Sequence, residues 1–186
     1  DSVASRGLGD VYKRQLMEDD EERRKALTFV FVGGGFAGIE ALAELEDMVR
    51  AGVRERETLT DADVRFVLVE AMPRVMPEVG EAQARWVVDH LRSRGIDVYL
   101  ETFLEDCTDK VCKLSNGEQF TADTIVWNAG VKANPVLVDS DLPLDDRGRV
   151  TVRADLRVED ENGVVEGAWA AGDNAAVPDL TGDGPG

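Results

Sequence analysis

The stretch from Leu27 to Glu40 reads LTFVFVGGGFAGIE, and it decides the fold class. Its first six residues are apolar and β-prone, which predicts a short strand buried on both faces. After the glycines, apolar residues recur at helical spacing and predict an amphipathic helix: Ile39, Leu42, Ala43, Leu45, Met48 and Val49. A strand, a glycine turn and a helix in this order are typical of a Rossmann-type dinucleotide-binding unit.

Each position in the glycine run has a physical assignment. Gly33 permits a tight turn, Gly35 lets the backbone approach a pyrophosphate, and Gly38 lets helix and strand pack closely. Phe36 and Ala37 lie at the start of the helix, where free N–H groups attract phosphate without a cationic side chain. We predict that these five residues bind a dinucleotide. The alternative is a glycine-rich turn without a ligand.

The second predicted strand, VRFVLVE, ends at Glu70. From this position a carboxylate accepts hydrogen bonds from the adenosine ribose hydroxyls and repels a 2′-phosphate, so the expected cofactor is NAD(H). Glu70 lies 70 − 33 = 37 residues after Gly33, beyond the usual offset of about 20. A polar stretch at 53–63 accounts for much of the excess. Arg74 is interpreted as a solvated loop charge.

The remaining pattern completes an α/β fold. The first helix is expected to end near Gly52, and Trp86 and Trp127 are predicted core residues. A second helix is predicted over 81–94. Further strands are predicted at 96–100 and 124–130, with short β-prone pieces between them at 102–107, 111–114 and 119–120. We predict a Rossmann-like NADH-binding domain with a parallel sheet and a β-meander.

Three parts follow from this pattern. Residues 1–26 are predicted to be a lead, non-native or disordered over 1–15 and followed by a short exposed helix. Residues 27–133 form the predicted NAD(H)-binding domain. From 134 to 186 turns and short strands prevail, and this stretch is assigned below to a partial FAD-binding domain.

Composition narrows the function. The net charge of −17 argues against a nucleic-acid partner, because a phosphate-binding face needs clustered Lys and Arg. No window approaches the roughly 18 consecutive apolar residues of a membrane-spanning helix. Cys107 and Cys112 are too few for a disulfide framework, which fits a reducing cytoplasm; we interpret them as inert thiols or an incidental cross-strand pair. His90 is the only histidine, so neither a His-rich metal site nor Ser-His-Asp catalysis is expected.

Four segments taken together resemble the flavin-dependent pyridine nucleotide oxidoreductases that have two dinucleotide-binding domains. They are TFVFVGGGFAGIE, FVLVEAMPRVMP, TIVWNAGVKANP and GAWAAGDNAAVPDL. Within that superfamily they look most like the type II NADH dehydrogenases, which are single-subunit NADH:quinone oxidoreductases. The resemblance implies an NADH domain inserted into an FAD domain, with hydride passing from NADH to FAD and electrons then passing to a quinone.

The resemblance also implies roles for individual residues. Ala129 and Gly130 would present backbone near the NADH. Gly172 and Asp173 match the family's second FAD signature, in which the Asp carboxylate accepts a hydrogen bond from a ribityl hydroxyl of the flavin. Glu40 matches a glutamate near the nicotinamide and the isoalloxazine, and is the candidate catalytic residue. Its alternative role is an exposed first-turn glutamate favoured by the helix dipole.

Departures from the family pattern set further expectations. The family's first GxGxxG, its quinone-side segment and its C-terminal membrane anchor do not occur in these 186 residues. We therefore expect an internal piece that is inactive alone. Its parent is expected to be cytoplasmic and peripheral on the membrane through its missing anchor, with a homodimer as one option for its assembly. The alternatives are a ferredoxin or rubredoxin reductase, or a non-catalytic NADH-binding module.

Overall fold

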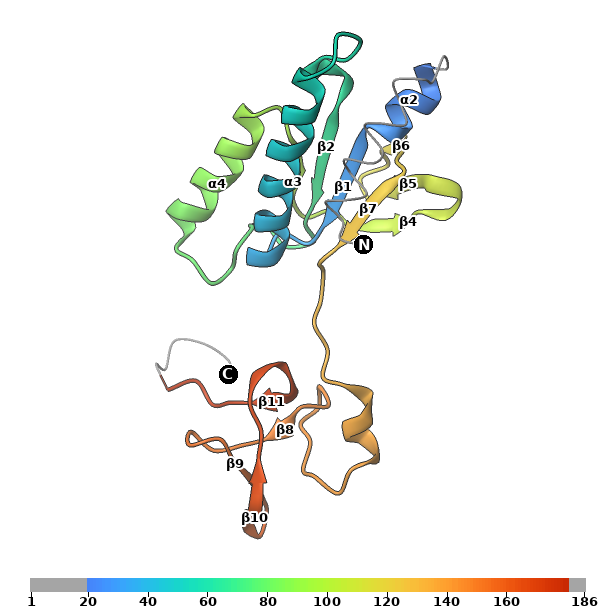
Figure 1. Ribbon diagram of the computed structural model, residues 1–186. Coiled ribbons are helices and arrows are strands. Elements are labelled where there is room, and N and C mark those ends of the chain that lie inside the picture. The colour runs from blue at the N-terminus through green and yellow to red at the C-terminus, as the bar shows by residue number, and fades with distance from the viewer. Residues whose placement is uncertain (1–19, 181–186) are drawn as a thin grey trace. The chain divides into compact units, whose positions relative to one another are not determined.

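The computed structural model describes residues 20–180 of the chain. The chain divides into two compact units, Asp1–Ala129 and Gly130–Gly186. Figure 1 shows both units. The division lies four residues before the predicted boundary after residue 133 (133 − 129 = 4). The predicted lead at 1–15 and the first residues of the predicted helix over 16–26 lie outside the described residues; the rest of that helix is α2, Asp20–Ala26.

The first unit is built on a parallel sheet with the strand order β3-β2-β1-β7. Its strands are β1 (Thr28–Val32), β2 (Arg65–Val69), β3 (Asp97–Tyr99) and β7 (Thr124–Trp127). β1 pairs with β2 from Thr28↔Arg65 to Val32↔Val69, and with β7 from Phe29↔Thr124 to Val32↔Trp127. Because all four strands run in the same direction, their carboxyl ends lie at one edge of the sheet. The expected α/β class is confirmed.

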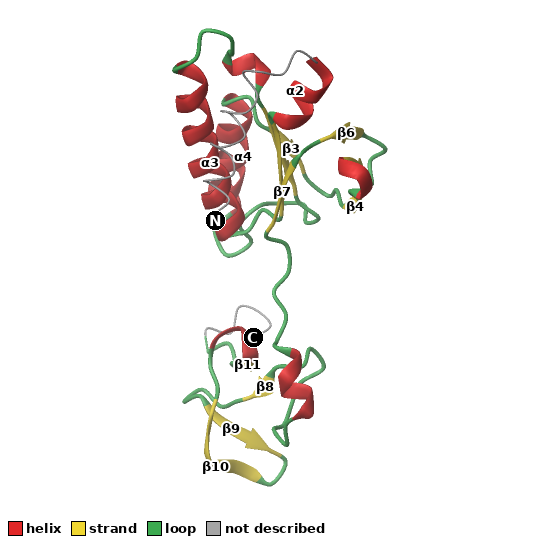
Figure 2. Cartoon of the chain, turned by 45° about the vertical axis from the view of Figure 1, so that its right-hand side comes forward, coloured by secondary structure: helices red, strands yellow, loops and turns green. Residues whose placement is uncertain are grey.

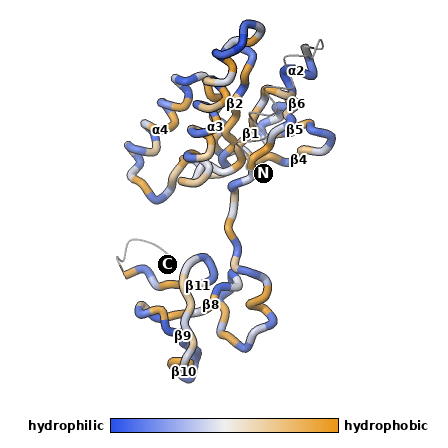
Figure 3. The backbone as a smooth tube through the Cα atoms, viewed as in Figure 1, coloured by the Kyte–Doolittle hydropathy of each residue, from blue (hydrophilic) through white to orange (hydrophobic). Residues whose placement is uncertain are grey.

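Alternate residues of β1 and β2 pack against different layers. Phe29 and Phe31 join the core beneath α3 (Phe36–Arg54) and α4 (Glu81–Ser93). Val30 and Val32 join the core beneath an antiparallel meander of β4 (Leu104–Asp106), β5 (Val111–Leu114) and β6 (Gln119–Thr121). Figure 2 shows the helices and the meander on opposite faces of the sheet. Burial on both faces explains why β1 is apolar from Phe29 to Val32, as the colours of Figure 3 show.

A buried charge cluster joins the two helices of this unit. The Glu46 carboxylate is only 1% exposed, and it accepts hydrogen bonds from Arg50 and Arg94. Arg94 also binds Asp47, and Arg50 donates to the Arg94 carbonyl at 3.0 Å. A buried carboxylate needs such partners, since unpaired burial of a charge costs several kcal/mol. The cluster fixes the end of α4 against α3.

The second unit has short elements and a small core. Its strands are β8 (Val150–Thr151), β9 (Arg157–Asp160), β10 (Gly163–Trp169) and β11 (Ala175–Ala176), with 3₁₀ turns η3 (Pro135–Asp139) and η4 (Gly172–Asn174). β9 pairs antiparallel with β10, and β8 pairs parallel with β11. The buried apolar residues that form the core of its described part are Val150, Val152, Val158 and Ala175.

Three details differ from the sequence prediction. Trp86 and Trp127 are not core residues, because 64% and 62% of their surfaces are exposed. Trp86 lies on the outer side of α4 and stacks on His90 with ring centroids 5.1 Å apart. The first helix passes through Gly52 and ends at Arg54, because Gly52 and Val53 are still buried against the core.

None of the described helices has both the length and the apolar character needed to cross a membrane.

Candidate functional site

The glycine turn between β1 and α3 leaves no room for side chains at its two ends. Gly33 has a φ of +106°, and a Cβ there would lie 2.7 Å from the backbone nitrogen of Ala129. A Cβ on Gly38 would lie 1.9 Å from the Gly33 carbonyl oxygen. Both clashes are with backbone, which cannot swing away. These two glycines therefore allow β1, α3 and the segment after β7 to approach one another.

The middle of the turn is open instead. A Cβ on Gly35 would meet no atom within 4 Å. Gly35 caps α3 without a side-chain hydrogen bond, and the next two residues, Phe36 and Ala37, are exposed. The first N–H groups of a helix have no partner within the helix, and they carry its partial positive charge. The turn thus has the space and the donors that a pyrophosphate needs, and its residues fit a dinucleotide.

Glu70 lies directly beside this turn. One of its carboxylate oxygens accepts the Gly34 N–H at 2.5 Å, and the other accepts the Met72 N–H at 2.7 Å. The side chain therefore connects the end of β2 to the glycine turn. Each carboxylate oxygen has a second lone pair, so these bonds leave acceptor capacity for a ribose hydroxyl. That contact stays a prediction.

Gly34 is a site residue that the sequence reasoning missed. A Cβ on Gly34 would lie 2.8 Å from a side-chain carbon of Val75 and 3.0 Å from the Glu70 carboxylate. The Gly34 carbonyl also accepts the Met76 N–H at 2.8 Å. The loop after β2 thus folds onto the turn. The signal in the sequence was the unbroken triplet of glycines, since the GxGxxG pattern leaves its second position unrestricted.

The segment after β7 lies against the glycine turn. Asn128 donates its backbone N–H to the Val32 carbonyl at 2.8 Å. The Trp127 indole N–H donates to the Ala129 carbonyl at 2.8 Å, on the exposed side. The structure therefore brings Ala129 to Gly33, as the predicted site requires. Gly130 is exposed, has a φ of +76° and begins the second unit.

Glu40 is exposed on the second turn of α3. The structure places it on the helix that begins at the glycine turn, two residues after Gly38. Its proposed contact with the nicotinamide stays a prediction. The expected place of Glu40 in the first turn is wrong, because the first turn of α3 holds no acidic residue, and the helix dipole acts mainly within that turn.

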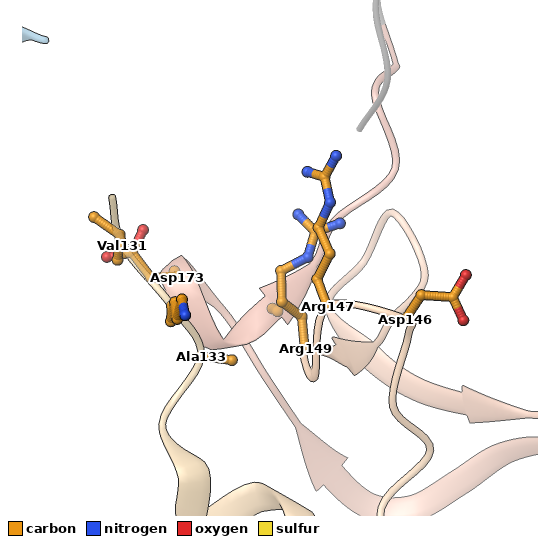
Figure 4. A pocket seen from close by; sticks show the side chains of 9 residues that line it. Val131, Ala133, Asp146, Arg147, Arg149 and Asp173 are labelled. Atoms are coloured by element: carbon orange, nitrogen blue, oxygen red, sulfur yellow. The ribbon is translucent and has the colours of Figure 1, made fainter. Parts of the chain in front are cut away.

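Gly172 and Asp173 belong to a separate cavity inside the second unit. This cavity has a volume of about 600 Å³. Figure 4 shows Asp173 and Val131 on one side of it and two arginines on the other. Gly172 has a φ of +69°, which favours glycine. The lining residues are Val131, Lys132, Ala133, Asp146, Arg147, Arg149, Gly172, Asp173 and Ala175.

The two cysteines are free thiols. Cys107 is exposed, whereas Cys112, on β5 of the meander, is buried in the core between the meander and the parallel sheet. Burial raises the pKa of the Cys112 thiol to about 11. A thiol that stays protonated near neutral pH is a poor nucleophile, so Cys112 behaves as a small apolar core residue. In the part of the chain that the structure describes, no group of three or more His, Cys, Asp or Glu side chains could hold a metal ion.

Comparison with known proteins gives consistent matches. A family model described as pyridine nucleotide-disulphide oxidoreductase matches residues 6–183. The chain is 31% identical over 147 residues to a type II NADH:quinone oxidoreductase of Staphylococcus epidermidis, covering 77% of this chain and 36% of that protein. It is 28% identical over 158 residues to a probable NADH dehydrogenase of Dictyostelium discoideum, covering 83% of this chain and 35% of that protein. The chain thus spans about a third of the length of these relatives.

Solved structures show the same fold. NDH2 from Plasmodium falciparum in complex with NADH matches with a TM-score of 0.80 and 18% identity, covering 92% of this chain and 36% of that one. An NAD-dependent persulfide reductase from A. fulgidus matches with a TM-score of 0.57 and 27% identity, covering 80% of this chain and 25% of that one. Both likenesses support the α/β class.

Proposed function

This chain belongs to the pyridine nucleotide-disulphide oxidoreductase family, and from this premise we propose that it is the NADH-binding part, with some of the flavin-binding part, of an NADH:quinone oxidoreductase. Dependence on FAD and NAD(H) is characteristic of the family. The observation that carries the proposal is the glycine turn, closed at Gly33 and Gly38 and open at Gly35.

The residues of this chain would bind and orient, because the bound nicotinamide and flavin supply the hydride chemistry. Gly35, Phe36 and Ala37 would offer backbone N–H groups to the pyrophosphate. Glu70 would accept hydrogen bonds from the adenosine ribose while holding Gly34. In the second unit, Asp173 would accept a hydrogen bond from the ribityl chain. Glu40 is the proposed catalytic residue, in contact with the nicotinamide end.

A quinone is the proposed electron acceptor of the whole protein. The support is the 31% identity to proteins named type II NADH:quinone oxidoreductase. A role in a respiratory chain follows from this proposal, and so does a parent protein that is peripheral on the cytoplasmic face of the membrane. A homodimer is part of the same proposal. The similarity to the persulfide reductase keeps another reductase of this family as the second candidate.

Nucleotide binding to the purified chain tests the proposal. We expect NADH to bind at least tenfold more tightly than NADPH, because the Glu70 carboxylate repels a 2′-phosphate. Glu70→Gln keeps the size and one acceptor oxygen but removes the charge. It should therefore bring the ratio of the NADPH and NADH dissociation constants closer to one. The matched control is Glu78→Gln, an exposed glutamate in the loop after β2.

Calorimetric titration with both nucleotides measures the ratio. Equal binding of NADH and NADPH by the unaltered chain, or an unchanged ratio in Glu70→Gln, would contradict the assignment. The acceptor is tested in the whole protein by steady-state NADH oxidation with a soluble quinone and then with a ferredoxin. Indifference to the quinone would favour the other reductases, and Glu40→Gln should slow the quinone reaction.

A further inference from the structure

Three of the residues that line the cavity in the second unit are cationic, although the chain is strongly acidic. Lys132, Arg147 and Arg149 line it, in a chain with a net charge of −17. Of its two acidic lining residues, Asp146 points away from the arginines and Asp173 lies across from them (Figure 4). Like charges repel, so two neighbouring arginines on one wall favour an anionic ligand between or above them.

A tight turn holds the two arginines on the same side. One oxygen of the Asp145 carboxylate accepts the backbone N–H groups of Arg147 at 2.9 Å and of Arg149 at 2.8 Å. The other oxygen accepts the Arg149 side-chain Nε–H at 2.8 Å. Gly148, with a φ of +77°, closes the turn by donating to the Asp145 carbonyl at 2.9 Å. Figure 4 shows both guanidinium groups extending in the same direction.

The two arginines differ in their partners. Arg149 is paired with Asp145, and the side chains of both are 24% exposed. Arg147 is exposed, and in the described part of the chain its guanidinium has no side-chain partner. Arg149 is therefore fixed by the protein, while Arg147 has its full set of donors available for a ligand. Guanidinium groups bind phosphoryl oxygens with two parallel hydrogen bonds.

The opposite wall supplies a different kind of contact. The Asn174 side chain accepts the backbone N–H of Asn134 at 2.8 Å, which ties the segment carrying Lys132 to the turn carrying Asp173. Asp173 offers carboxylate oxygens, which accept hydrogen bonds from hydroxyl groups. One wall of the cavity thus suits hydroxyls, and the other suits a phosphoryl group. A polyol phosphate combines both.

We propose that Arg147 and Arg149 bind a phosphoryl group of the flavin. Asp173 accepts hydrogen bonds from the ribityl hydroxyls of the same flavin. The proposal rests on the proposed function, because it takes the ligand of this cavity to be a flavin. Beyond that function, the proposal assigns a cationic wall formed by the turn Asp145–Arg149. No glycine-rich motif in the sequence indicates this wall. Arg147 is the residue on which ligand binding depends most, because the Arg149 guanidinium is already paired with Asp145.

Binding of two flavins to the purified chain tests the proposal. FMN carries a ribityl phosphate and riboflavin does not, so we expect FMN to bind about tenfold more tightly at low ionic strength, the ratio that a charge-assisted hydrogen bond supports. Quenching of flavin fluorescence on titration with the chain measures both dissociation constants. Arg147→Gln should abolish the difference, and 0.5 M NaCl should reduce it.

The matched control is Arg153→Gln. Arg153 lies in the same unit outside the cavity, its side chain is 46% exposed, and it pairs with Glu159 at 3.8 Å. This variant should keep the preference for FMN. Circular dichroism of both variants checks that the fold is retained, which the exposure of both arginines favours.

Several outcomes would overturn the proposal. Equal affinity for FMN and riboflavin, or an equal response of the two arginine variants, would remove the phosphoryl contact. Inorganic pyrophosphate that binds equally to both variants would indicate an adventitious ion only. NADH titration of the same samples separates this failure from that of the proposed function. Intact NADH binding without a preference for FMN would reject the cationic wall and leave the NADH-binding unit standing.

Discussion

The two units differ most in the size of their cores. The first unit buries eighteen described apolar residues between sheet and helices, and seven more beneath the meander. The second unit buries four in its described part, and Val136, Val138 and Trp169 are each at least 65% exposed. Buried apolar surface is the main source of folding free energy. The hydrophobic contribution to folding is therefore much larger in the first unit than in the second. The second unit relies on turns held by side-chain hydrogen bonds.

The difference also appears in how each unit builds its site. In the first, backbone approach between β1, α3 and β7 forms the glycine turn, and a substitution there disturbs the core. In the second, a turn at the surface carries the arginines, and a substitution there leaves the core intact.

The substitution Gly38→Ala should disrupt the first unit. Its Cβ would lie 1.9 Å from the Gly33 carbonyl oxygen, and the backbone there is fixed between β1 and α3. We expect a loss of about 3 kcal/mol of unfolding free energy, the scale of a severe steric change in a packed interior. Urea unfolding followed by circular dichroism measures it, and NADH binding should fall with the folded fraction.

The matched control for Gly38→Ala is Gly35→Ala. Gly35 has a φ of −70° and no atom within 4 Å of an added Cβ, so the fold should be retained. NADH should nevertheless bind more weakly, because the methyl group enters the space above the turn. If Gly35→Ala destabilised the chain as much as Gly38→Ala, the contrast between closed and open glycines would be wrong.

The extent of sequence prediction follows the same contrast. The parallel sheet, both helices and the meander of the first unit were predictable, because burial forces apolar periodicity on them. The exposure of Trp86 was not, because an aromatic at helical spacing can lie on either side of a helix. Nor was the buried cluster around Glu46, because Arg94, which joins the cluster from the end of α4, lies 48 residues away in sequence. The arginine turn of the second unit carries no periodic signal and needed the structure.

Thermal unfolding should occur in two steps, with the second unit first. Its smaller core predicts a midpoint about 10 °C lower, since about 1 kcal/mol shifts the midpoint of a small domain by about 4–8 °C. Cys112 reports on the first unit, because it is buried and its pKa is raised to about 11. A thiol reagent should label Cys107 at once and Cys112 only in the second step.

Hydrogen exchange measured by mass spectrometry identifies which unit opens. The amides of β9 and β10 should exchange at temperatures where those of β1 and β2 are still protected. A single transition, in which Cys112 and the β9 amides lose protection together, would show that the smaller core does not make the second unit an independent step.

The smallest expected effect is that of Asp145→Asn in the second unit. The N–H groups of Arg149 and Arg147 and the Arg149 guanidinium hold the pKa of the Asp145 carboxyl below its usual range. A carboxyl whose pKa is lowered by folding stabilises the fold above its unfolded pKa of about 3.9. That contribution disappears as the pH falls through the lower pKa of the folded state. Asparagine keeps one acceptor oxygen for the backbone N–H groups but loses the charge. The second unit should therefore melt at most a few degrees lower at pH 7, because solvent screens this partly exposed pair. The difference from the unaltered chain should shrink as the pH falls toward 2, because protonation of Asp145 removes the charge that distinguishes the two proteins. The control is Asp146→Asn, whose carboxylate is exposed and directed away from the arginines. Melting curves of the three proteins between pH 2 and 7 decide the matter: a difference that persists undiminished in acid would mean that the charge of Asp145 does not support the turn.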